Sequence, residues 1–171
     1  MLKLADILEA LTGIRPEGAG MVITEGVIDS RLAIPGALFV ALPGERTDGH
    51  QYVTQAFQNG ASLALVQQEM SEEIPTLDLR GAITHVELAN RLAELEGPLC
   101  LLVDDSLKAL QQIARFWRKQ HKVVVVGITG SVGKSTTKEL VAEVLGQRYS
   151  TLKNKGNFNN EIGLPLTLLS L

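Results

Sequence analysis

Hydrophobic residues recur at two different spacings through the first 120 residues, and these spacings predict alternating helices and strands. Near the start, an apolar stripe at helical spacing is followed by Gly13, so we expect a short amphipathic helix. The stripe consists of Leu4, Ile7, Leu8 and Leu11. Short apolar runs predict buried strands at 37–42, 62–66 and 99–103. Alternation of this kind is typical of an α/β fold.

Helices are expected after the first and third of these strands. The polar loop Gly44–His50 leads into a helix that turns Val53, Ala56 and Phe57 inward and stops at Gly60. Behind the third strand, Ser106 is the predicted N-cap of a helix with an apolar stripe. That stripe contains Leu107, Leu110, Ile113, Ala114 and Trp117. The stretch 67–97 has less pattern, although Leu88, Leu92 and Leu95 favour a helix over 86–96.

The pattern changes after residue 120. Val123–Val126 is a continuous β-branched run, as expected for a strand buried on both faces of a parallel sheet. We therefore place a domain boundary near residue 120. Residues 1–120 form one predicted α/β domain, and residues 121–171 open a second one and stop.

Composition and charge exclude several classes of protein. The 171 residues carry 16 basic and 19 acidic side chains, a net charge of −3, which argues against a general nucleic-acid binder. No stretch approaches the roughly 18 apolar residues of a membrane span. A single cysteine, Cys100, lies in an apolar run and is expected to be a buried hydrophobe. These features favour a cytoplasmic protein.

A glycine-rich turn follows the Val123–Val126 run and leads into a helical pattern. Gly130 and Gly133 allow the backbone to turn several N–H groups toward phosphate oxygens, and the following helix adds its positive end. Lys134 can reach the β- and γ-phosphates of a nucleotide, and the Ser135 hydroxyl can bind Mg²⁺. The predicted nucleotide-binding residues, which the resemblance described below assigns to ATP, are Gly130, Ser131, Val132, Gly133, Lys134, Ser135 and Thr136.

The loop departs from the strict P-loop pattern at one position. Ile128 occupies the place of the first glycine, and the glycine lies one residue earlier, at Gly127. An ordinary strand-to-helix turn is the alternative interpretation. The Lys134-Ser135 pair after Gly133, together with the strand before the loop, favours a phosphate site.

Three stretches together resemble the Mur ligase family. They are the loop Gly127–Thr137, the N-terminal stretches Asp29–Arg31, Pro35–Leu42 and Gly44–His50, and the C-terminal stretch Lys155–Pro165. The last of these resembles the member of the family that uses D-alanyl-D-alanine. The resemblance covers nearly the whole chain, although residues 67–97 contribute little to it.

The resemblance implies a fold and a reaction. The fold is a small UDP-substrate-binding domain followed by the start of a P-loop ATPase α/β domain with a parallel sheet. The reaction is the ATP- and Mg²⁺-dependent joining of D-alanyl-D-alanine to UDP-N-acetylmuramoyl-tripeptide through an acyl phosphate, by a monomer. The family has three domains, so we expect this chain to be an N-terminal fragment that is inactive alone.

The resemblance also assigns site residues. Lys134 is the expected catalytic residue. Ser30, Arg46 and Thr47 become candidate contacts to the UDP portion, since arginine and hydroxyl groups suit pyrophosphate and uracil oxygens. The remaining candidates are Asn157, Asn159 and Asn160 for substrate, and Ser135 and Glu161 for Mg²⁺.

Simpler structural roles compete with several of these assignments. The three asparagines can make turns of their own, and Glu161 can cap the apolar helix that follows it. Asp48 is expected to brace its loop, and no catalytic role is assigned to His50.

Two alternative functions stay open. One is a neighbouring ligase of the same family that adds a different amino acid, against which the Lys155–Pro165 stretch argues. The other is a non-catalytic UDP-sugar-binding or regulatory module. The apolar end of the chain argues against the second, because an unpaired piece of parallel sheet would leave apolar faces uncovered.

Overall fold

A computed structural model gives the fold of the chain and describes residues 1–44, 47–95, 97–156 and 158–171. Five strands and six α-helices alternate along these residues, with two short 3₁₀ helices, η1 and η2, between them. The elements are α1 (Leu4–Thr12), β1 (Gly26–Val27), η1 (Ser30–Leu32), β2 (Leu38–Val40), η2 (Gly49–Tyr52), α2 (Val53–Gln58), β3 (Leu63–Val66), β4 (Thr76–Asp78), α3 (His85–Ala93), β5 (Leu99–Leu102), α4 (Ser106–Gln120), α5 (Lys134–Gly146) and α6 (Gly163–Leu168).

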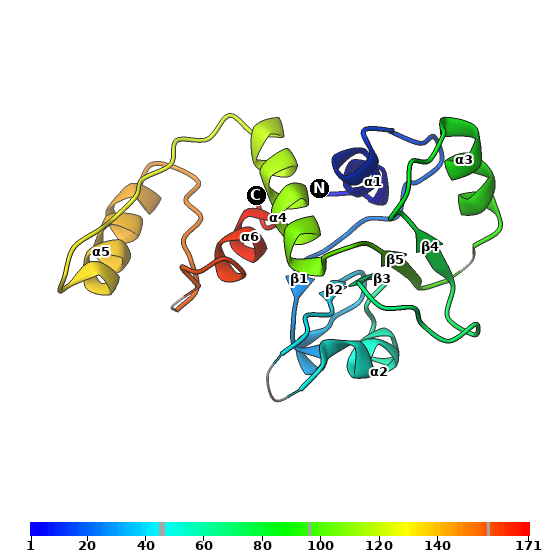
Figure 1. The fold of residues 1–171 in the computed structure, drawn as a ribbon. Helices are drawn as coiled ribbons and strands as arrows, with labels where there is room; N and C mark the ends of the chain where they lie inside the picture. Colours follow the sequence, from blue (N-terminus) through cyan, green and yellow to red (C-terminus); the bar gives the residue numbers. More distant parts are fainter. Residues whose placement is uncertain (45–46, 96, 157) are drawn as a thin grey trace.

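The strands form one parallel sheet in the order β1-β2-β3-β5-β4 (Figure 1). Leu38 is in register with Leu63, and Leu63 with Leu99, so the three central strands begin at one level. All their carboxyl ends therefore meet at one edge. In open parallel sheets this is the edge at which ligands bind.

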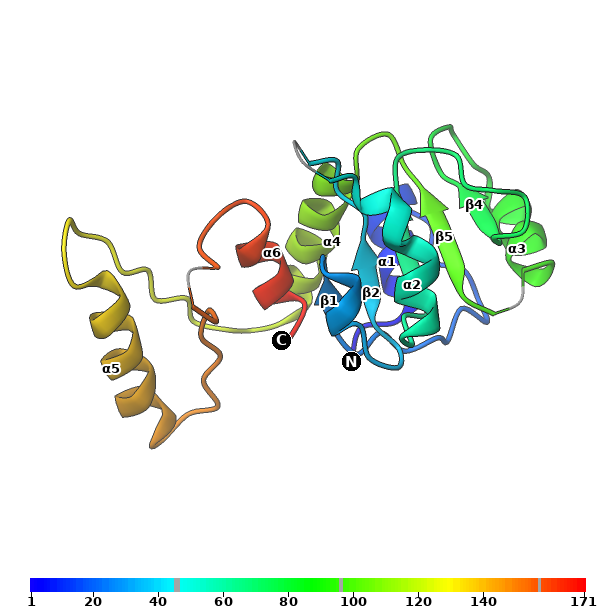
Figure 2. The same cartoon turned by 90° about the horizontal axis from the view of Figure 1, so that it is seen from below.

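Helices cover both faces of the sheet, with α1, α3 and α4 on one face and α2 on the other (Figures 1 and 2). Alternate residues of β2 show the division: Leu38 and Val40 join the core with α1 and α4, whereas Phe39 packs with α2. The central strands are buried on both faces, which explains their continuous apolar runs.

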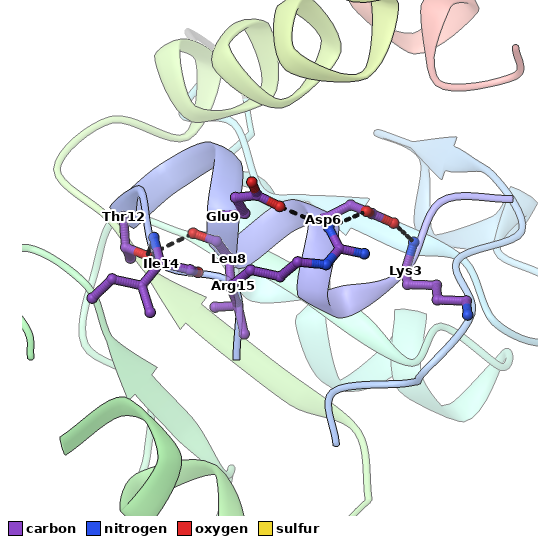
Figure 3. Close-up of polar contacts among 7 residues, drawn as sticks. All are labelled: Lys3, Asp6, Leu8, Glu9, Thr12, Ile14 and Arg15. Carbon is purple, nitrogen blue, oxygen red and sulfur yellow. Dashed lines mark hydrogen bonds and ion pairs between the residues drawn. The ribbon is translucent and has the colours of Figure 1, made fainter. Parts of the chain in front are cut away.

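Helix α1 is held at both ends by polar contacts (Figure 3). The backbone N–H of Lys3 donates to Asp6 Oδ2 at 2.8 Å, and a carboxylate in the first turn also suits the helix dipole. Arg15 then donates to Asp6 at 2.8 Å and to Glu9 at 2.7 Å. Gly13 ends the helix in the left-handed conformation, with φ of 77°, as its position predicted.

The expected strands and helices of the first 120 residues are present, with small differences. The helix predicted over 86–96 is α3, which begins with a Thr84–Glu87 capping box. The N-cap of α4 is Asp105, whose side chain accepts from Lys108 N, so the prediction for Ser106 was wrong by one residue. A carboxylate accepts this bond and complements the helix dipole at once.

The strand predicted at Val123–Val126 is absent. These residues are in extended coil, and Val124 is 93% exposed. A strand needs hydrogen bonds from a neighbouring strand, and within the described residues the sheet takes all its strands from the chain before Val103. The β-branched run therefore has no partner among those residues, and the prediction of a buried strand was wrong for this structure.

The last residues return to the sheet. Helix α6 packs against α4, and Leu166 and Leu169 join the core that contains α1 and α4 (Figures 1 and 2). Helix α5 lies apart from the sheet and buries none of its residues. Among the described helices, none has the length and apolar character needed to cross a membrane. The division near residue 120 stays a prediction.

Candidate functional site

The predicted phosphate loop is an open turn before α5. Gly130 and Gly133 have φ of 148° and 81°, values that strongly favour glycine. No atom lies within 4 Å of the point where a Cβ would stand at Gly127 or Gly133. The turn is therefore free for a ligand to approach the backbone closely.

Helix α5 begins at Lys134, as predicted, and its N-cap Gly133 offers no side-chain cap. The first N–H groups of the helix thus suit an anion. The Lys134 ammonium donates to the carbonyl of Gly130, across the turn. The Lys134 and Ser135 side chains are exposed, and so are Ser131, Val132 and Thr136. This set of donors fits the phosphates of a nucleotide, and the exposed hydroxyl of Ser135 fits Mg²⁺.

A second group of candidates lies at the carboxyl edge of the sheet. Ser30 follows β1 and is only 5% exposed. Its hydroxyl donates to Gln55 Oε1 at 3.0 Å, and its carbonyl accepts from Asn59 Nδ2 at 2.8 Å. Ser30 therefore joins η1 to α2, and its side chain is already engaged within the protein.

The loop after β2 is braced from within. Asp48 caps η2 by accepting from His50 N at 3.0 Å, which confirms the bracing role predicted for Asp48. His50 is 7% exposed, and its Nε2 accepts from Gln67 N at 3.0 Å. Gln67 Oε1 in turn accepts from Ser106 N at 3.0 Å. These contacts join the ends of β2, β3 and β5.

Two carboxylates at this edge have shifted pKa values. Hydrogen bonds from the side chain and then the backbone of Arg31 lower the pKa of Asp29 to about 2. The backbone N–H of His50, followed by its side chain, holds the pKa of Asp48 below its ordinary value. Thr47 is exposed beside these groups, whereas Arg46 lies outside the described residues. Both carboxylates are thus held ionised by neighbours that fix the loops.

The asparagine-rich segment has a largely structural arrangement. Asn160 Oδ1 accepts from Gly163 N at 2.8 Å and so holds the start of α6. The carbonyl of Glu161 accepts from Gln111 Nε2 at 3.1 Å, and its side chain is exposed. Asn159 is exposed, and Asn157 lies outside the described residues.

The structure describes no preformed metal-binding cluster around the predicted ligands Ser135 and Glu161. Within the described residues, no three His, Cys, Asp or Glu side chains gather at a metal-binding distance. A Mg²⁺ held by Ser135 would therefore depend on phosphate oxygens for its other ligands, as Mg²⁺ commonly does.

Two polar residues that hold the phosphate-loop helix carried no signal in the sequence. Lys138, one turn after Lys134, donates to the carbonyls of Asn154 and Gly156 at 2.8 and 3.1 Å. Asn154 Nδ2 donates to the carbonyl of Phe158 at 2.7 Å. Neither residue belongs to a recognisable motif, so only the folded chain shows their role.

The chain belongs to the Mur ligase family. The family model described as "Mur ligase family, catalytic domain" matches residues 23–118, which include the sheet. The model described as "Mur ligase middle domain" matches residues 128–171, which include the glycine-rich turn and α5. The resemblance inferred from the three sequence stretches is thereby confirmed.

Two similar proteins of the family carry the same name. The UDP-N-acetylmuramoyl-tripeptide–D-alanyl-D-alanine ligase of Synechocystis is 41% identical over 143 residues, covering 84% of this chain and 27% of that protein. The ligase of the same name from Bacillus subtilis is 38% identical over 156 residues, covering 91% of this chain and 30% of that protein. The chain thus spans less than a third of the length of these relatives.

A solved structure shows the same arrangement. MurF from Acinetobacter baumannii superposes with a TM-score of 0.70 at 32% identity, covering 98% of this chain and 32% of that one. The α/β fold with a parallel sheet, expected from the sequence, is therefore that of the N-terminal part of a MurF ligase.

Proposed function

We propose that this chain contributes the nucleotide-phosphate site and the UDP-substrate domain of a MurF-type ligase. The proposed reaction is the ATP-dependent addition of D-alanyl-D-alanine to UDP-N-acetylmuramoyl-tripeptide. The observation that carries the proposal is the open glycine turn before α5, with Lys134 and Ser135 exposed at its mouth, in a chain of the Mur ligase family. The names of the relatives support the choice of substrates.

Each part of the phosphate loop has a distinct role in this proposal. The backbone N–H groups of residues 130–136 bind phosphate oxygens, Lys134 neutralises the charge that develops during phosphoryl transfer, and Ser135 binds Mg²⁺. Bound ATP supplies the phosphoryl group that activates the terminal carboxylate of the UDP-linked peptide as an acyl phosphate. The amine of D-alanyl-D-alanine then forms the amide bond, and phosphate leaves.

The carboxyl edge of the sheet is the proposed place of the UDP portion. Thr47 is exposed in the loop after β2, which Asp48 braces. Ser30 holds the neighbouring loop after β1 through its hydrogen bond to Gln55. Arg46 is proposed as a further contact, and Asn157, Asn159 and Asn160 as residues near the reacting carboxylate. The side chain of Asn160 already accepts from Gly163 N, so its backbone is the better candidate for contact. We place the activity in the cytoplasm, with the whole protein acting as a monomer and this part inactive alone.

Calorimetric titration of the chain with ATP and Mg²⁺ tests the proposal. Lys134→Ala should weaken binding about tenfold or more, because a charge-assisted hydrogen bond contributes roughly 1.5–3 kcal/mol. Lys119→Ala, at an exposed lysine of α4, is the matched control and should bind as the unaltered chain does. Equal affinity of the Lys134→Ala variant, or no binding by the unaltered chain, would overturn the assignment of this loop.

A further inference from the structure

Arg31 is the outward-facing residue of the turn Asp29–Arg31, which follows β1. We propose that its guanidinium binds the diphosphate group of the UDP-linked substrate, and that Asp29 holds it in place for this contact. This role for Arg31 rests on the proposed function, which puts the UDP portion at the carboxyl edge of the sheet. It adds a contact that the sequence did not assign, since Ser30 was the candidate from this turn.

Ser30 and Arg31 point in opposite directions. The Ser30 side chain turns inward: the residue is 5% exposed, and its hydroxyl donates to Gln55 Oε1 at 3.0 Å. The Arg31 side chain is 79% exposed in this chain. The backbone of the turn is fixed as well, because the Ser30 carbonyl accepts from Asn59 Nδ2 at 2.8 Å. A ligand at this edge therefore meets the guanidinium of Arg31 rather than the hydroxyl of Ser30.

Asp29 holds the guanidinium along one of its edges. Its Oδ1 accepts from Arg31 N at 3.0 Å and from Arg31 Nε at 2.9 Å, and its Oδ2 accepts from Nη2 at 2.6 Å. These bonds, from the side chain first and then the backbone, lower the pKa of Asp29 to about 2, so the carboxylate stays ionised at neutral pH. The arginine side chain is thus already ordered, and less conformational entropy is lost when a ligand binds to it.

The other edge of the guanidinium is open for an anion. An arginine has one N–H on Nε and two on each Nη nitrogen, and the pair with Asp29 uses Nε and Nη2. Within the described residues, Nη1 has no protein acceptor, and Nη2 has one only in Asp29. Nη1 and Nη2 together present a fork that matches two oxygens of a phosphate group. Arg31 can therefore bind Asp29 and a phosphate at the same time.

A second turn of the same design, at the end of β4, shows the contrast. Asp78 Oδ1 accepts from Arg80 N and Nε, both at 3.0 Å, and Asp78 Oδ2 accepts from Nη2 at 2.7 Å. Arg80 Nη2 also donates to Glu69 Oε1 at 3.2 Å, and the arginine side chain is 38% exposed. Arg80 is thus paired with two carboxylates, whereas the described residues give Arg31 one. Of the two arginines, Arg31 is the one suited to a further anion.

The place of Arg31 suits the UDP portion of a substrate. The turn lies at the carboxyl end of β1, the edge at which ligands bind in parallel sheets. The pKa of Arg31 is raised above its ordinary value, chiefly by Asp29 and to a smaller extent by the nearby phenol of Tyr52 in η2. Tyr52 and Thr47 both lie between β2 and α2, and both are exposed. Arg31 therefore lies close to the second loop of the proposed site.

Titration of the whole 171-residue chain with UDP, followed through the backbone amide signals in NMR, tests this role. Arg31→Ala should weaken UDP binding about tenfold or more, because two charge-assisted hydrogen bonds to phosphate are lost. Arg31→Lys keeps the charge but not the fork, so its affinity should lie in between. Arg80→Ala is the matched control at the far end of the sheet and should bind UDP as the unaltered chain does.

Asp29→Asn separates a contact with UDP from a pair that only holds the turn. The asparagine oxygen can still accept from the N–H groups of Arg31, and the loss of one negative charge favours an anionic ligand. We therefore expect this variant to bind UDP at least as tightly as the unaltered chain. If the pair only held the turn, Asp29→Asn and Arg31→Ala would both weaken UDP binding, and that result would overturn the role of Arg31.

Two further outcomes distinguish this role from the proposed function. If UDP shifts the signals at the carboxyl edge equally in the unaltered chain and in Arg31→Ala, Arg31 is not a contact and the proposed UDP site still stands. If UDP shifts no signal of the unaltered chain, the UDP site is refuted and the role of Arg31 with it. The titration with ATP then judges the phosphate loop separately. Arg31 lies outside the core, so Arg31→Ala is expected to stay folded, and its amide spectrum shows whether it does.

Discussion

His50 Nδ1 lies 2.5 Å from Asp48 Oδ1, while Nε2 of the same ring accepts from the backbone N–H of Gln67 at 3.0 Å. An acceptor nitrogen carries no proton, so the proton of the neutral ring is on Nδ1 and is donated to Asp48. The ring thus joins the loop after β2 to the end of β3. In the described structure the ring therefore braces the loop after β2 against β3.

We predict that His50→Phe destabilises the chain by about 1–3 kcal/mol, because it leaves the half-buried N–H of Gln67 without an acceptor. His50→Gln, whose carbonyl oxygen can accept in place of Nε2, should lose less. Urea denaturation measures both, and His85→Phe at an exposed histidine is the control. Equal losses in His50→Phe and His50→Gln would show that the hydrogen bond to Gln67 contributes nothing.

Asp29 should titrate with a pKa of about 2, because it accepts hydrogen bonds from the side chain and backbone N–H of Arg31. A carboxyl whose folded pKa is lowered stabilises the fold above its ordinary value of 3.8, and this stabilisation is lost as the pH falls toward about 2. NMR titration of the carboxyl carbon measures the pKa. Arg31→Ala should raise it toward 3.8, and an unchanged value would contradict the assigned cause.

Cys100 should resist thiol reagents while the chain is folded. Burial raises the pKa of its thiol to about 12, so almost no thiolate forms at neutral pH. Reaction with Ellman's reagent should be complete in denaturant and absent without it. Rapid reaction in the native state would mean that the sheet opens between β3 and β5, since Cys100 of β5 is in register with Ala64 of β3.

Ser135→Ala should reduce the dependence of nucleotide binding on Mg²⁺ and leave the fold unchanged. The exposed hydroxyl is the proposed metal ligand, and its loss removes no packing. Titrating ATP at a series of Mg²⁺ concentrations measures the effect, with Ser131→Ala in the same loop as the control. Identical Mg²⁺ profiles for Ser135→Ala and the unaltered chain would remove Ser135 from the proposed site.

UDP-N-acetylmuramic acid should bind weakly at the carboxyl edge of the sheet. In an NMR titration, the backbone signals of Thr47 and of the loop containing Ser30 should shift, because both lie at this edge. Thr47→Val keeps the shape of the side chain and removes the hydroxyl, so it should weaken binding. Shifts confined to α3 or to the opposite edge would contradict the proposed location.

The sequence was most informative where local pattern and packing agree. The apolar runs around Phe39 and Leu65 predicted β2 and β3, because a strand buried on both faces has no polar alternation. Strand β1 escaped notice since it contains only Gly26 and Val27, and glycine is rare in strands. Its existence depends on pairing with β2, which no local pattern reports.

At the candidate site too, local features were predictable from the sequence and contacts between distant elements were not. The spacing of Gly130, Gly133 and Lys134 predicted the open turn and the start of α5, because glycine conformation and helix initiation are local properties. The inward hydrogen bond of Ser30 to Gln55 was not predictable, since it joins residues from different elements. The prediction for Val123–Val126 failed for a related reason: its pattern describes a strand, but a strand forms only beside a partner.

The packing of Leu166 and Leu169 against Gly26 has a consequence for the order of folding. Leu166 comes from the opposite end of the chain, so this contact closes a very long loop and is entropically costly to form early. During synthesis, β1 and β2 emerge well before α6, so they can pair before Leu166 reaches Gly26. Among the described residues β1 is an edge strand, and its two-residue length limits how much of another chain could add to it.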